Sequence, residues 1–232
     1  MTGKTILDKL LALRVNRPFG QFGTVDDECT DNGAIGCTHT CWRFIAFAYT
    51  GKWYSHDELS HLSGYPCGGG ATNRGMRVEE SQRLAAALHL PYVYRGGLTS
   101  SELLTASNKG PVLFAIRYGD WPAWRGYHGQ TPPAPWARPL GKAGRNQFTW
   151  SGSHATVLLG YVRIMAGARF VRNDCYAMEP NHDSPARPEN VAYDLVTQTD
   201  LNRAFQGVKR LGWAQTMAMV PTKAPTFPGG LR

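Results

Sequence analysis

The sequence predicts an α+β fold in which N-terminal helices pack on an antiparallel β-sheet. Three observations support this prediction. Segments whose apolar residues recur at helical spacing are concentrated before residue 110. Short apolar runs of strand length then become frequent, as in 111–116 and 154–161. The segment 169–174 follows the second run closely enough to pair with it as the next antiparallel strand.

The first predicted helices lie on either side of an irregular loop. Residues 4–15 form a short amphipathic helix, because their apolar side chains fall mostly along one side. A loop rich in Gly, Asp, Asn and Pro follows over 16–36. The next helix begins near Cys37, shows helical spacing from Cys41 onward, and is expected to end at Gly51.

A serine placed three residues before a glutamate predicts the start of the third helix. Ser55 and Glu58 match the capping-box pattern at that point. His56 and His61 in this helix are five residues apart and do not share a face well, so we expect both to be exposed to solvent. A longer helix is predicted over 78–90.

The remaining elements are mostly strands. We expect strands at 92–94, 111–116, 154–161, 169–174, 191–196 and 213–220, and short helices at 100–109 and 200–205. The stretch at about 120–147 is rich in Trp and Pro and is expected to be an ordered insertion. Residues 221–232 are expected to form a flexible tail.

Length, composition and charge restrict the class of protein. The 232 residues suffice for a substantial core, and we expect a single domain over 1–220. The net charge of +8 suits an acidic partner such as an anionic cell wall. Because no basic run is interleaved with aromatic residues, we do not expect nucleic acid as a partner. We expect no signal peptide and no membrane span, since no apolar segment is long enough for either.

The cysteines bear on redox setting and on metal binding. Their count of five is odd, so at least one thiol stays unpaired, and together with the missing signal this favours a reduced setting. The alternative to thiols that bind no metal is a zinc site, formed by Cys29, Cys37, Cys41 and either His39 or Cys67. The spacings of eight, four and twenty-six residues lack the short Cys-x-x-Cys pairs of structural zinc modules. We therefore expect no metal and no other cofactor.

Cys37 is the candidate nucleophile because of its place at a helix start. Unpaired backbone N–H groups and the positive end of the helix dipole favour an anion there. A thiol at this position ionises more readily, and the thiolate is the form that attacks. The competing interpretation is that Cys37 and Cys41 are ordinary small core residues.

A nucleophilic thiol needs a base, and the base needs a third group that fixes its orientation. His154 opens an apolar strand, which places its ring at the edge of the sheet. Asn173 and Asp174 close the next predicted strand and are able to orient an imidazole. Each residue alone fits an ordinary structural role, but the three positions together predict a catalytic constellation.

This order of motifs resembles that of papain-like cysteine peptidases. It is most similar to the bacterial branch that includes the double-glycine leader peptidases of bacteriocin exporters. There the nucleophile typically appears as Asp-Cys-Gly-Pro-Ala-Cys before an apolar helix, and residues 36–41, Gly-Cys-Thr-His-Thr-Cys, keep both cysteines at the same spacing. The resemblance covers roughly 31–205 and implies a papain-like α+β fold.

The resemblance assigns Cys37 as the nucleophile and Cys41 as a core residue one turn on. Papain itself suggests the opposite, since its nucleophile is followed by Trp-Ala-Phe and Cys41 is followed by Trp-Arg-Phe. We prefer Cys37, because a thiol at the helix start suits the task better.

The same resemblance implies the partners of the nucleophile. The general base of the branch opens a Gly-His-aliphatic strand, which 152–157 resembles with one inserted residue, so His154 takes that role. The acid closes a following strand, usually as Asp-Pro. Asp174 is assigned to it although no Pro follows, and Asn173 is the alternative because an amide serves in papain.

The oxyanion donor is where the sequence departs most from the family. The family places a Gln six residues before the nucleophile, and this chain has Asp31 there. Its negative charge would oppose an oxyanion. The donor is then expected to be Asn32 or Gln21, or is missing.

The resemblance implies a cysteine peptidase or amidase that hydrolyses a peptide or a peptidoglycan stem peptide. The rival expectation is a papain-like fold reused as a non-catalytic structural or binding subunit, for example of a phage tail, which Asp31 favours. Phage structural proteins are then possible partners. The expected location is the cytoplasm or a phage particle.

Overall fold

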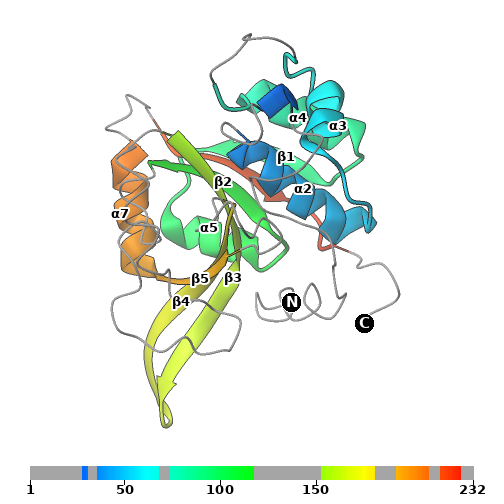
Figure 1. Ribbon diagram of the computed structural model, residues 1–232. Helices are drawn as coiled ribbons and strands as arrows, with labels where there is room; N and C mark the ends of the chain where they lie inside the picture. Colours follow the sequence, from blue (N-terminus) through cyan, green and yellow to red (C-terminus); the bar gives the residue numbers. More distant parts are fainter. Residues whose placement is uncertain are drawn as a thin grey trace.

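A computed structural model describes residues 28–30, 36–67, 74–117, 153–180, 192–208 and 215–225. The predicted helix at 4–15 and the predicted insertion at about 120–147 lie outside these residues, as do Asp31 and the oxyanion candidates Gln21 and Asn32. The described elements confirm the α+β class, with N-terminal helices packed on an antiparallel sheet (Figure 1).

The N-terminal helices begin and end where local signals place them. A short 3-10 turn, η1 (Glu28–Thr30), precedes α2 (Cys37–Thr50), which ends at Gly51 with a left-handed φ of 71° that favours glycine. The predicted capping box opens α3 (His56–Ser63): Glu58 N–H donates to Ser55 Oγ, and Ser55 N–H donates to the Glu58 carboxylate. The fourth helix, α4 (Val78–Ala87), stops before residue 90.

Six strands form one antiparallel sheet in the order β1-β6-β2-β3-β4-β5. Their bounds are β1 Tyr92–Gly96, β2 Val112–Arg117, β3 Ser153–Ala166, β4 Arg169–Glu179, β5 Ala192–Thr197 and β6 Met217–Pro221. The long β3–β4 hairpin projects from the body of the molecule (Figure 1). Two more helices, α5 (Ser100–Ser107) and α7 (Gln198–Val208), complete the described elements.

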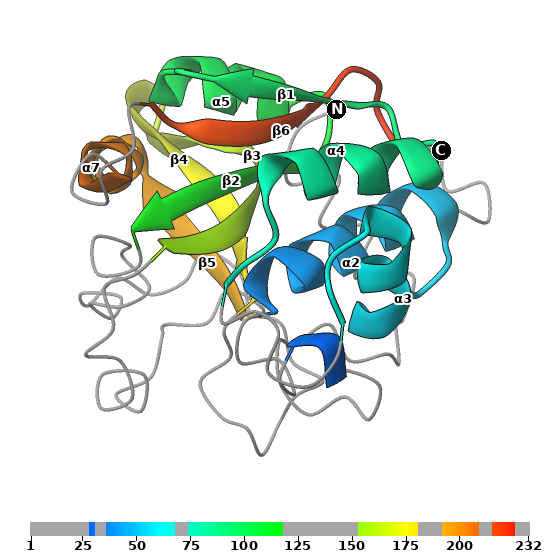
Figure 2. The ribbon, with the colours of Figure 1, turned by 90° about the horizontal axis from the view of Figure 1, so that it is seen from above.

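Alternation along the strands divides the core between the two faces of the sheet. Leu113 of β2 and Val157 of β3 pack with the α2 and α4 side chains. Phe114 and Leu158, their chain neighbours, pack with α5 and α7 on the opposite face. Helices therefore cover both faces, with α2, α3 and α4 on one side and α7 on the other (Figure 2).

A buried polar cluster lies beneath the η1–α3 corner, and here one expectation was wrong. His61 is exposed as predicted, but His56 is fully buried. Its ring nitrogens are hydrogen-bonded to the hydroxyls of Thr30 and Thr40, at 3.0 and 2.9 Å. The Ser55 cap fixes the direction of α3, and the tertiary contact with η1 and α2 then turns its first residue inward.

The start of the predicted tail is held against the body. Pro221 is the last residue of β6 and pairs with Tyr92. Thr222 N–H donates to the Pro91 carbonyl at 2.7 Å, and the Tyr49 hydroxyl donates to the Lys223 carbonyl at 2.7 Å. The described residues 222–225 therefore continue the fold, and residues 226–232 lie outside the description.

Candidate active site

Cys37 is the first residue of α2. Gly36 precedes it as the N-cap, and among the described residues no side chain caps this helix end. Since glycine has no side chain, the N-cap position supplies no side-chain acceptor to the backbone N–H groups of the first turn. The side chain of Cys37 is only 9% exposed, so its sulfur lies in a largely desolvated position.

The Cys37 thiol is hydrogen-bonded to the side chain of His154. Burial by itself raises the pKa of Cys37, but the hydrogen bond and the charge of His154, together with two further contacts, outweigh it and leave that pKa below its usual value. The backbone N–H of Ala155 and the hydroxyl of Thr38 add smaller contributions in the same direction. This electrostatic setting favours a thiolate beside an imidazolium.

His154 reaches Cys37 because two elements meet at their N-terminal ends. It is the second residue of β3 and pairs with Ile116 of β2, so its backbone is fixed on one side by the sheet. The helix α2 packs on this sheet through Cys37, Ala155 and Val157, among others. The ring of His154 is 3% exposed, which restricts its motion as well as its hydration.

Cys41, the alternative nucleophile, lies one helical turn further along α2. Its side chain has no exposed surface and belongs to the apolar core between α2 and the sheet. The hydrogen bond to His154 is made by the thiol at the helix start. This geometry favours Cys37 as the nucleophile.

The register of β3 and β4 keeps both predicted orienting residues away from His154. Asp174 pairs with Val162 and Asn173 pairs with Arg163. Val162 is eight residues beyond His154 on the same strand, which corresponds to about 25 Å of extended chain. The structure thus brings Cys37 and His154 together but not Asp174 or Asn173.

The residue of β4 that does approach the start of β3 is Glu179. It follows Met178, which pairs with Val157, only three residues beyond His154. Glu179 ends the strand and precedes Pro180. Sequence reasoning missed this position, although Glu179-Pro180 offers the acid-Pro pattern that Asp174-Cys175 lacks. The missing information was the length of the hairpin, since β4 runs on to Glu179 rather than ending at Asp174.

The described residues offer one part of an oxyanion hole. The backbone N–H groups at the start of α2, including that of Cys37 itself, lie where the helix dipole favours an anion.

Comparison with known proteins adds no assignment: no family model matches the chain, and no curated protein is significantly similar to it. In the described part of the chain, no helix is both long enough and apolar enough to cross a membrane.

Proposed function

We propose that this protein is a thiol hydrolase with a papain-like site, in which Cys37 is the nucleophile and His154 the general base. The observation that carries the proposal is the buried hydrogen bond between the Cys37 thiol and the His154 side chain. A desolvated thiol with a lowered pKa is rarely needed for packing, whereas nucleophilic catalysis requires it.

The reaction follows from the pair. Thiolate Sγ of Cys37 attacks the carbonyl carbon of an amide, and the carbonyl oxygen takes the negative charge next to the helix N-terminus. The His154 imidazolium gives its proton to the leaving nitrogen as the C–N bond breaks, which leaves an acyl-thioester. Neutral His154 then takes a proton from water, the hydroxide attacks the thioester, and the carboxylic acid and the Cys37 thiolate are released.

Glu179 is the residue that we assign to orient His154, in place of Asp174. Its backbone position at the end of β4, beside the start of β3, supports this assignment. In a catalytic triad the third group stabilises the imidazolium charge and holds one ring nitrogen, so that the other faces the nucleophile. Glu179 is thus a positioning residue rather than a reacting one.

A peptide or a peptidoglycan stem peptide is the substrate class that we propose. Both contain amide bonds that a thiolate attacks, and the net charge of +8 suits the anionic bacterial wall. A virion-borne enzyme acting on such a wall, with phage structural proteins as partners, is consistent with this charge.

Hydrolysis of labelled substrates tests the proposal. Purified protein is incubated with dye-labelled peptidoglycan and, separately, with a mixture of fluorogenic peptides. We expect the wild type to release the label from one of these substrates. The rate of release should fall by at least about 10²-fold in Cys37→Ala and in His154→Ala. Asp174→Ala is the matched control and should retain wild-type activity.

The opposite outcome has a definite meaning. If the wild type releases no label, and a peptidyl electrophile directed at thiolates does not modify Cys37, the site is not catalytic. The fold would then serve as a structural or binding subunit.

A further inference from the structure

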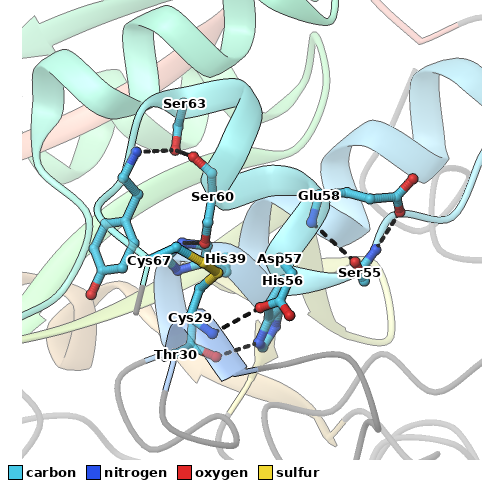
Figure 3. The surroundings of a disulfide bond; sticks show 11 residues. Cys29, Thr30, His39, Ser55, His56, Asp57, Glu58, Ser60, Ser63 and Cys67 are labelled. Atoms are coloured by element: carbon cyan, nitrogen blue, oxygen red, sulfur yellow. Dashed lines mark hydrogen bonds between the residues drawn. A yellow bond between two sulfur atoms is a disulfide. The ribbon is translucent and has the colours of Figure 1, made fainter. Parts of the chain in front are cut away.

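Three potential metal ligands converge at the corner between η1 and α3. The sulfurs of Cys29 and Cys67 and a ring nitrogen of His61 all lie within 4.8 Å of one another. In the structure Cys29 and Cys67 form a disulfide, with their Cα atoms 4.5 Å apart, and Figure 3 shows its surroundings. The other three cysteines, Cys37, Cys41 and Cys175, form no disulfide and are buried.

The two sulfurs and the ring nitrogen are ligands that suit zinc better than magnesium or calcium. Thiolate sulfur and imidazole nitrogen are the usual ligands of Zn²⁺, whereas Mg²⁺ and Ca²⁺ prefer oxygen. Two thiolates on tetrahedral zinc lie about 3.8 Å apart, given Zn–S bonds of about 2.3 Å. The ligand atoms of Cys29, Cys67 and His61 lie within 4.8 Å of one another, so one ion between them is within reach of all three.

We propose that Cys29, Cys67 and His61 form a zinc site when the disulfide is reduced. The disulfide and the zinc site exclude each other, because both use the same two sulfurs. A dithiol reductant transfers two electrons to the disulfide and is itself oxidised to a disulfide, which leaves two thiols on the protein. Zn²⁺ then binds both sulfurs as thiolates, two protons are released, and neutral His61 supplies a third ligand. Water completes the tetrahedron.

The frame around the ligands is fixed independently of the disulfide. The backbone N–H of Cys29 donates to the carboxylate of Asp57 at 2.8 Å, which ties η1 to the first turn of α3. Tyr65 N–H donates to the Ser63 hydroxyl at 3.2 Å, and the Tyr65 hydroxyl donates to the Arg74 carbonyl at 2.6 Å, which hold the segment leading to Cys67. The ligand positions are therefore retained when the S–S bond opens.

The location of the site gives access to the metal. Cys29 is 6% exposed, whereas His61 and Cys67 are exposed, so an ion enters from solvent and ends against a buried sulfur. Wherever thiols are kept reduced, paired cysteines near a histidine bind metal more often than they form a disulfide. The same cluster therefore staples η1 to the end of α3 in either redox state.

Cobalt(II) titration of the reduced protein tests this proposal. Co²⁺ replaces Zn²⁺ in tetrahedral sites and reports thiolate ligands through a sulfur-to-cobalt charge-transfer band. The titration is made in Cys37→Ala protein, because the Cys37–His154 pair is itself a possible ligand set. We expect one equivalent of Co²⁺ to bind with this band, and Zn²⁺ to displace it.

The variants and controls make the result decisive. Cys67→Ser should abolish the band, His61→Ala should weaken binding by about tenfold or more, and Cys175→Ala should leave it unchanged. Zn²⁺ should raise the melting temperature of the reduced Cys37→Ala protein but not of its disulfide-bonded form, and Mg²⁺ should raise neither. The proposal is overturned if the reduced protein shows no thiolate band, or if Cys67→Ser or, should that variant not fold, Cys29→Ser retains it.

Discussion

The Cys37 thiol at the first position of α2 is hydrogen-bonded to the side chain of His154 at the start of β3. This contact joins two residues that are far apart in the sequence, in a place where both side chains are nearly inaccessible to water. Low exposure strengthens the electrostatic coupling between them, because less solvent screens the charges.

The first prediction concerns the pH dependence of Cys37 alkylation. Because the pKa of Cys37 is lowered, the iodoacetamide rate of the wild type should reach half its plateau at a lower pH than that of a free thiol, whose pKa is about 8.5. In His154→Ala the pKa of Cys37 should rise, since burial is then opposed only by the weaker contributions of Ala155 and Thr38. The modified residue is identified by mass spectrometry.

The matched control for this experiment is His61→Ala, which removes an exposed histidine from α3. It should leave the alkylation profile unchanged. A wild-type profile with its midpoint near pH 8.5, or one that does not respond to His154→Ala, would contradict a thiolate–imidazolium pair.

The second prediction separates Glu179 from Asp174. In Glu179→Ala, the imidazolium loses a stabilising charge, so the apparent pKa of Cys37 should rise. Hydrolysis should fall as well, by up to about 10⁴-fold, the effect known for the orienting carboxylate of a serine triad. Glu179→Gln should restore part of the activity.

Asp174→Ala should behave as the wild type in both measurements, since its backbone lies at the Val162 position of the hairpin. The opposite pattern, with loss in Asp174→Ala and none in Glu179→Ala, would show that the assignment to Glu179 is wrong.

The third prediction concerns stability in acid. Burial, followed by the charge of Arg43, lowers the pKa of His39 to about 3, from about 6.5 in the unfolded chain. The unfolded state thus binds more protons between these values. The contribution of His39 is complete above pH 6.5 and is lost as the pH falls toward 3, by about 1.4 kcal/mol per pH unit.

Urea unfolding of the disulfide-bonded protein at pH 7, 6 and 5 measures this dependence. In His39→Gln the free energy of unfolding should fall less steeply with decreasing pH, by the equivalent of about one proton, because glutamine does not titrate. His61→Gln, at an exposed position, should decline as the wild type does. An unchanged slope in His39→Gln would refute the prediction.

The fourth prediction concerns the packing of α2 against α4. The buried indole N–H of Trp42 donates to the Ser81 hydroxyl at 3.1 Å. Ser81→Ala leaves this donor unsatisfied and should lower the free energy of unfolding by about 1–3 kcal/mol. Ser101→Ala, at an exposed helical position, should change it by less than about 0.5 kcal/mol. Equal effects in chemical denaturation would contradict the argument.

Local signals were sufficient to locate most of the described elements. Helical spacing placed α2 and its end at Gly51, and the Ser55–Glu58 pair placed the start of α3. The apolar runs located β2 and the start of β3. Each of these depends on residues within a few positions of one another, so each can be recognised without knowledge of the rest of the chain.

The sequence by itself determined the α+β class, the position of Cys37 at a helix start and that of His154 at a strand start, because periodicity and capping are local properties. Only the tertiary structure decided which groups meet. It brought His154 to Cys37, buried His56, joined Cys29 to Cys67, and set a hairpin register that moves Asp174 away and Glu179 closer. Register and helix-on-sheet packing depend on the whole core, and no short segment of sequence specifies them.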